Sequence, residues 1–212
     1  MPAGQTADAF PPPPWILRGR ALVSVWLTEA PVLPAGLRPL RLGGRSLVVG
    51  LWADYGPGST LAYREVLLAT PVWDRRGPAV HVSCCWVDAP ASVAGGRAVW
   101  AVPKRLGAFS PGERLNDAGV PVAALEDAQP SGPHVPAPLF GRLLQADGDT
   151  LVSAAFSGRA RIAPARVRWT APPGSPLARV AGRTPLLSVA LSDLELRVGR
   201  PQRRPNGGNF RT

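Results

Sequence analysis

Short apolar runs separated by turn residues dominate the pattern of this chain. Strands are predicted at Arg20–Thr28, Ser46–Ala53, Leu61–Thr70, Ala79–Val87, Gly119–Leu125, Leu139–Gln145, Thr150–Ser157, Arg159–Ile162 and Pro185–Val198. Turns are expected at Asp147–Asp149, where a glycine stands between two aspartates, and near Gly158. Strands do not alternate with helices, and no internal repeat is visible. The pattern therefore predicts a mainly β fold, with antiparallel strands forming a closed or cone-like barrel and a few short helices.

One segment departs from this pattern. Ala89 to Ala98 is rich in small residues and glycine, and it predicts a short helix with Asp88 as its cap and Pro90 in its first turn. An apolar run, Val99–Val102, follows directly. Pro103 favours an extended conformation at the residue before it, so we expect Lys104 to lie in a loop or to begin a strand.

The length of 212 residues suits one domain, which we place at residues 10–198. Residues 1–9 are polar and are expected to be flexible. Residues 199–212 contain mostly Arg, Pro, Gly, Asn and Gln, and they predict a disordered basic tail.

Charge and cysteine content narrow the setting. The net charge of +10 would attract an anionic partner. However, the arginines are spread along the chain without a basic helix or an aromatic platform, so nucleic acid is not the expected partner. Cys84 and Cys85 are adjacent and would point to opposite faces of a strand, which indicates free thiols in a reducing compartment. No signal peptide or membrane span is evident, and we expect a cytoplasmic protein.

Lys104 is the only lysine among 24 basic residues. A bias toward arginine can empty a surface of lysine, but arginine cannot act as an amine nucleophile. The lone lysine is therefore a candidate catalytic amine, and the alternative is a leftover surface residue. Burial or a neighbouring cation favours the neutral, nucleophilic form of an amine. The apolar run before Lys104 offers burial, and Arg105 after it offers a cation. Neighbouring side chains on an extended segment point apart, so burial alone is the alternative cause.

Other chemistries find little support. The two histidines, His81 and His134, stand in no metal-ligand spacing, and neither a serine nucleophile elbow nor a phosphate-binding glycine loop is present. No metal or cofactor is expected. An amine that forms an imine with a ketone remains as the chemistry that these residues favour.

Two segments resemble the acetoacetate decarboxylase family. The first runs from Ala91-Ser92-Val93-Ala94-Gly95-Gly96-Arg97 through Val102-Pro103-Lys104-Arg105-Leu106-Gly107. It is similar to the family's Gly-Arg-Glu segment and its Pro-Lys-Lys-Leu-Gly motif. Asp54 through Tyr63-Arg64-Glu65 resembles the loop and strand that carry an active-site glutamate. More loosely, Arg18-Gly19-Arg20 resembles the position of a substrate-side arginine. The resemblance covers about residues 10 to 160.

The resemblance implies roles for these residues. Lys104 would form the imine, Glu65 would transfer a proton or orient the amine, and Arg105 stands where the family has a second lysine. Arg20 and Arg97 become candidates for binding a substrate carboxylate, with a solvated or structural arginine as the alternative. Trp100 is a candidate wall of an apolar pocket, or simply a core residue.

The chain also departs from the family pattern. Ala98 replaces the glutamate after Gly-Arg, and the strand near Val48 lacks a second acidic residue. We expect a lyase that decarboxylates a small, acetoacetate-like β-keto acid. The alternatives are aldol condensation with dehydration on the same lysine, or a non-catalytic ligand-binding protein that keeps the fold. The resemblance also implies a homo-oligomer.

Overall fold

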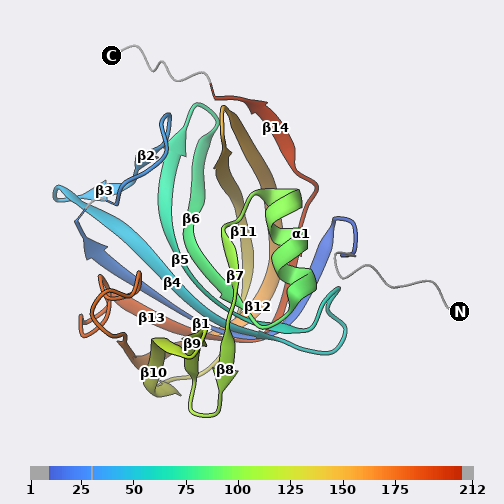
Figure 1. The fold of residues 1–212 in the computed structure, drawn as a ribbon. Helices are drawn as coiled ribbons and strands as arrows, with labels where there is room; N and C mark the ends of the chain where they lie inside the picture. Colours follow the sequence, from blue (N-terminus) through green and yellow to red (C-terminus); the bar gives the residue numbers. More distant parts are fainter. Residues whose placement is uncertain (1–9, 30, 207–212) are drawn as a thin grey trace, which may run out of the picture.

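Long strands make up most of the computed structural model of this chain, which describes residues 10–29 and 31–206 (Figure 1). The long strands are β1 (Trp15–Thr28), β4 (Arg45–Tyr55), β5 (Tyr63–Asp74), β6 (Gly77–Val87), β10 (Val120–Pro130), β11 (Val135–Asp147), β12 (Thr150–Thr170) and β13 (Leu187–Val198). The short ones are β2 (Arg38–Pro39), β3 (Arg41–Leu42), β7 (Lys104–Leu106), β8 (Ala108–Ser110), β9 (Arg114–Asp117) and β14 (Gln202–Pro205). Within this part of the chain α1 (Pro90–Trp100) is the single helix, and the predicted mainly β class is confirmed.

Strand pairing closes part of this sheet into a ring. The order around the ring is β11, β6, β5, β4, β1, β13 and β12, and β12 pairs back with β11. Most neighbours are antiparallel, as predicted. The exception within the ring is the contact between β11 and β6, which is parallel and joins Leu143 to Val80. A closed ring leaves every strand with one face turned inward, so alternate residues along each strand share an interior.

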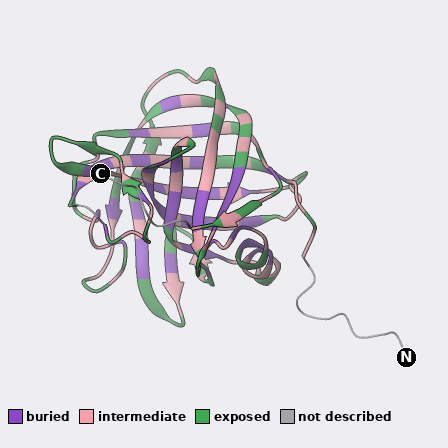
Figure 2. Cartoon of the chain, turned by 90° about the horizontal axis from the view of Figure 1, so that it is seen from above, coloured by how far each residue is buried: buried purple, intermediate pink, exposed green. Residues whose placement is uncertain are grey.

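Two apolar clusters follow from this alternation. Leu51 packs against the cluster inside the ring, whereas its neighbour Trp52 belongs to a second cluster on the outer face. The second cluster includes Leu115 and Leu125, which β9 and β10 fold over the ring. Figure 2 shows buried and more exposed positions alternating along the strands.

Helix α1 lies close to Trp15, the first residue of β1, because the residues of the helix are small. A Cβ added at Gly95 would come within 2.6 Å of the Trp15 ring, so a larger residue would push the helix away from β1. The prediction that Asp88 caps this helix is wrong. Ala89 is the N-cap, without a side-chain capping bond. The Asp88 carboxylate instead accepts hydrogen bonds from the backbone and side chain of Arg64, both at 2.7 Å.

The C-terminal half differs from expectation in two places. The turn predicted near Gly158 is wrong, since β12 runs without a break from Thr150 to Thr170. A Cβ at Gly158 would collide with the Glu195 carbonyl oxygen of the neighbouring strand, so the glycine permits a close approach of two backbones. Part of the tail predicted to be disordered forms β14, which pairs with β12. Residues 1–9 and 207–212, for which flexibility was predicted, lie outside the described residues. In the part of the chain that is described, no helix is long and apolar enough to cross a membrane.

Candidate active site

Lys104 is the first residue of β7, the short strand that follows α1. The helix ends at Trp100. The next residue, Ala101, caps it with a left-handed φ of 54° and an N–H that donates to the Arg97 carbonyl oxygen at 3.0 Å. This turn reverses the chain so that β7 runs parallel to β6, with Lys104 beside Cys85. The backbone of Lys104 is therefore held by a strand partner, and its side chain points into the ring.

The Lys104 amine is buried and fully bonded. Its Nζ lies 2.7 Å from Glu65 Oε2, 3.0 Å from Ser92 Oγ and 3.3 Å from the Tyr63 hydroxyl. These three oxygens match the three N–H bonds of an ammonium group. The Lys104 and Glu65 side chains are only 7% and 8% exposed. The lone lysine of the chain is thus not a surface residue.

Glu65 is the acidic partner because of the alternation along β5. Tyr63, Glu65, Leu67 and Ala69 share the inward face of this strand, and Arg64 points away to Asp88. The Tyr55 hydroxyl lies 3.5 Å from Glu65 Oε1, and the Cys85 thiol lies 3.7 Å from Glu65 Oε2. The carboxylate therefore touches the amine on one side and a phenol on the other.

Burial shapes the acidity of the groups around Glu65. Burial, and then the negative charge of Glu65, raise the pKa of both Tyr55 and Tyr63 well above the usual value. The same two causes raise the pKa of the Cys85 thiol. Both phenols therefore stay protonated at neutral pH and can donate hydrogen bonds. They are the only two tyrosines in the chain.

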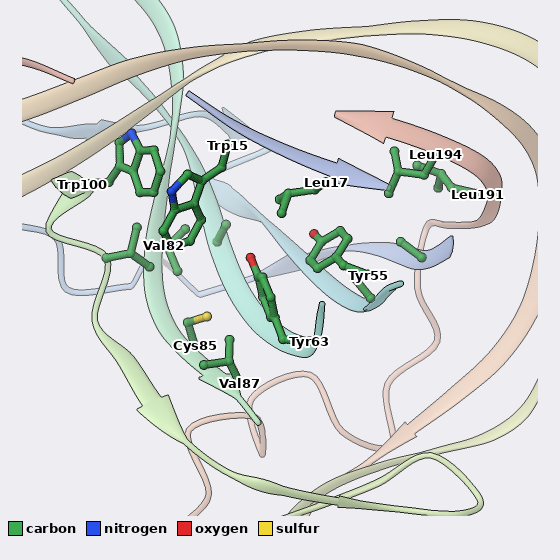
Figure 3. Packing of buried hydrophobic residues seen from close by; sticks show 14 of the residues in the cluster. Trp15, Leu17, Tyr55, Tyr63, Val82, Cys85, Val87, Trp100, Leu191 and Leu194 are labelled. Atoms are coloured by element: carbon green, nitrogen blue, oxygen red, sulfur yellow. The ribbon is translucent and has the colours of Figure 1, made fainter. Parts of the chain in front are cut away.

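A cavity of about 370 Å³ opens in front of the amine, and most of its wall is aliphatic or aromatic. Trp15 and Trp100 meet edge to face at 4.8 Å between ring centroids and form one side of it. Lys104 Nζ lies 4.7 Å from the centroid of the Tyr63 ring and 6.0 Å from that of Trp15. Figure 3 shows Tyr55, Tyr63, Trp15 and Trp100 arranged around this space.

The structure does not bring the three predicted arginines to the amine. Arg20 points outward to Asp54 at 3.2 Å, and its side chain is 72% exposed. Arg97 bonds to the Lys104 carbonyl oxygen at 2.7 Å and so fixes the β7 backbone from outside the cavity. Arg105 lies on the opposite face of β7 from Lys104, 63% exposed and 3.7 Å from Asp117, because neighbouring strand residues point in opposite directions.

Trp100 does line the cavity, and its indole N–H donates to the Gly199 carbonyl oxygen at 2.9 Å. Two residues of the site were missed in the sequence. Ser92 lies in the first segment that resembles the family, but neither the resemblance nor the small-residue pattern assigned it a role. Tyr55 could have been found, because it and Tyr63 bracket the loop that leads to the glutamate. Among the described residues, no group of three His, Cys, Asp or Glu side chains could hold a metal ion.

The site combines a β ring with a buried lysine–glutamate pair that faces an apolar interior. The class of the fold is that of the acetoacetate decarboxylase-like proteins. The family model described as Acetoacetate decarboxylase (ADC) matches residues 1–179, and the chain belongs to this family. None of the curated proteins matches the chain.

Solved structures share the fold at low sequence identity. An acetoacetate decarboxylase from Legionella pneumophila matches with a TM-score of 0.64 and 17% identity, over 96% of this chain and 92% of that one. The enduracididine biosynthesis enzyme MppR, complexed with the condensation product of pyruvate and imidazole 4-carboxaldehyde, has a TM-score of 0.59 and 18% identity, over 93% and 92%. An acetoacetate decarboxylase-like enzyme from Sphingomonas wittichii RW1 has a TM-score of 0.55 and 18% identity, over 97% and 96%.

Proposed function

We propose that the protein is a lyase that decarboxylates a β-keto acid through an imine on Lys104. The observation that carries this proposal is the buried contact of 2.7 Å between the Lys104 amine and Glu65, at the wall of a cavity large enough for a small molecule. A buried amine beside a carboxylate has a group that can take its proton and leave it nucleophilic. Family membership supports the same chemistry.

The reaction begins when Glu65 accepts a proton from the Lys104 ammonium. The free amine attacks the ketone carbon of the substrate, and loss of water gives a protonated imine. The bond between the α-carbon and the carboxylate then breaks, carbon dioxide leaves, and the bond's electron pair moves toward the imine nitrogen to form an enamine. A proton added at the α-carbon and a water molecule at the imine carbon release a ketone and restore the amine.

The apolar surroundings of Lys104 favour the step in which the substrate carboxylate loses its charge. A carboxylate held in an apolar cavity beside Glu65 is poorly solvated, and it becomes neutral when it leaves as carbon dioxide. Glu65, having taken the amine's proton, is placed to return it. The phenols of Tyr55 and Tyr63 remain donors during this cycle, so they can orient Glu65 and the carbinolamine oxygen.

Oxygen exchange tests the imine step separately from the loss of carbon dioxide. A methyl ketone incubated with the protein in ¹⁸O-labelled water should take up the label, since imine formation and hydrolysis replace the ketone oxygen. Lys104→Arg should lose this exchange, and Glu65→Gln should slow it. The matched control is Arg105→Lys, which changes the neighbouring residue on the other face and should exchange normally.

Carbon dioxide released from a β-keto acid then distinguishes decarboxylation from aldol addition, which would use the same enamine. Exchange without carbon dioxide from any β-keto acid would refute decarboxylation and favour aldol chemistry. If the protein shows no oxygen exchange and releases no carbon dioxide, the lyase is refuted and a ligand-binding protein is favoured.

A further inference from the structure

The wall of the cavity carries very few polar groups. Among the described residues that line it, polar side chains are supplied by Tyr55, Tyr63, Glu65 and Lys104, together with the indoles of Trp15 and Trp100. Both indole N–H groups are already bonded, to the carbonyl oxygens of Pro11 and Gly199. No arginine, histidine or amide side chain from the described part of the chain reaches this space.

This inventory leaves nothing to bind a second anionic group. Lys104 is the one cation in the described part of the wall, and in the proposed reaction its nitrogen becomes part of the imine. Glu65 would repel another carboxylate. A permanent charge elsewhere on the substrate would therefore be buried without a partner, which strongly disfavours binding.

The cavity is also larger than a four-carbon keto acid requires. At about 30 Å³ for a water-sized group, a volume of 370 Å³ holds roughly twelve such groups, well above the size of acetoacetate. Its wall continues along β5 from Glu65 through Leu67 to Ala69. Glu65 and Ala69 are separated by four strand steps, or about 13 Å, so the apolar wall extends far beyond the reacting amine.

The far part of the cavity has an apolar wall formed by neighbouring strands. Ala69 pairs across the strands with Val49, and both line the cavity. Phe140 on β11 also lines it and is 80% exposed, so the cavity reaches the molecular surface at an aromatic side chain. An extended hydrocarbon substituent would meet matching surface along this whole path.

We infer that the substrate is a β-keto acid whose ketone carries a long, uncharged apolar substituent, an alkyl chain or an aryl-alkyl group. The reacting carboxylate lies near Lys104, and the substituent lies along Leu67, Ala69 and Val49 toward Phe140. The products are carbon dioxide and a hydrophobic methyl ketone. This inference rests on the proposed function and adds to it the class of substrate.

A homologous series of substrates tests the inference. The value of kcat/KM is measured for acetoacetate and for the hexanoate, octanoate and decanoate homologues of the same 3-oxo acid. Burial of each added methylene should raise kcat/KM about fourfold until the cavity is full. A 3-oxo acid as long as the octanoate homologue but ending in a second carboxylate should fall below acetoacetate.

Variants locate the substituent. Ala69→Leu narrows the far part of the cavity and should lower the ratio of kcat/KM for the decanoate homologue to kcat/KM for acetoacetate at least tenfold. Val49→Ala enlarges the same part and should shift the optimum to a longer chain, which gives a second measurement if Ala69→Leu fails to fold. The control is Ala155→Leu, at an exposed position on β12 outside the cavity wall.

The outcomes separate this inference from the proposed function. Turnover that is highest with acetoacetate, or as fast with the dicarboxylate, would overturn the apolar substituent and leave the decarboxylase intact. A chain-length optimum unaffected by both variants would overturn its placement. If no member of the series is turned over, the proposed function itself fails.

Discussion

Gly96 offers a test of the lysine site that does not touch a polar group. It lies in α1, where alanine is ordinarily favoured over glycine by about 1 kcal/mol. At this glycine, however, the nearest neighbours of an added Cβ would all belong to Lys104: Cδ at 2.5 Å, Cε at 2.8 Å and Cγ at 3.2 Å. Gly96→Ala should therefore have two opposing effects on the free energy of unfolding: it stabilises the helix, and it displaces the buried Lys104 side chain.

The size of the displacement follows from these distances. Carbon atoms rest about 3.5–4.0 Å apart, so the middle of the Lys104 side chain must shift by about 1 Å. The Lys104 backbone is held by its pairing with Cys85, so the side chain must move instead. This movement displaces the amine and changes its contact with Glu65. A misplacement of about 1 Å at reacting groups can cost about 100-fold in rate. We expect a loss of this order in imine formation.

The assay combines turnover with a double-mutant cycle in urea denaturation. In wild type, Gly96→Ala should stabilise the protein by less than about 1 kcal/mol or destabilise it. In a Lys104→Ala background, where the obstructing atoms are gone, the same change should stabilise it by about 1 kcal/mol. Gly56→Ala is the control for the glycine substitution itself, because nothing lies within 4 Å of its added Cβ.

Two results would refute the reasoning. One is a Gly96→Ala protein with wild-type turnover. The other is an effect on stability that is the same with and without the Lys104 side chain, which would mean that the methyl group meets something other than the lysine.

Three further predictions concern ionisable groups. Burial, and then the negative charge of Glu65, raise the pKa of Tyr55 and Tyr63, so the phenols of the unfolded state lose their protons at a lower pH than those of the folded state. The free energy of unfolding should therefore fall above pH ~10 by about 1.4 kcal/mol per pH unit for each phenol. Tyrosinate absorbance should appear only as the protein unfolds. Burial alone would raise the pKa of Asp74, but the hydrogen bonds and charge of Arg142 outweigh it and hold this pKa below its usual value. The stabilisation that the ionised Asp74 carboxylate provides is therefore present above pH ~4 and is lost as the pH falls through the folded-state pKa. Asp74→Asn should lower the free energy of unfolding by about 3–5 kcal/mol at pH 7, measured by urea denaturation. The difference between this variant and wild type should shrink in acid. Burial raises the pKa of Cys84 to about 11, so iodoacetamide at pH 8 should modify it slowly in the native protein and fully in urea; fast native labelling would contradict the burial.

Much of the β architecture could be predicted because apolar runs and turn residues mark strands locally. Two errors arose where a distant partner decides the structure. Gly158 has the composition of a turn, yet it is needed where β12 and β13 approach closely. The tail segment Gln202–Pro205 has little apolar content, and it becomes a strand because β12 offers its edge and the carboxylates of Asp147 and Asp74 bind Arg203 and Arg204.

The site was predictable in the same uneven way. Lys104 stood out by scarcity and by its motif, and Glu65 by the resemblance of its strand; the structure places their side chains in contact. Ser92 could not be found, because its contact depends on how closely α1 packs. Arg105 follows Lys104 in the motif, but the alternation of a strand turns it to the other face.

Reductive trapping is the most direct test of imine chemistry at Lys104. The protein is treated with borohydride in the presence of a β-keto acid, and its intact mass and peptides are then measured. The account predicts one adduct per chain, carrying the mass of the reduced decarboxylated ketone, on the peptide that contains Lys104; Lys104→Arg should show none. Lys104 is the one lysine of the chain, so an adduct on this peptide identifies its amine. An unmodified Lys104 after treatment with substrates that are turned over would contradict the account.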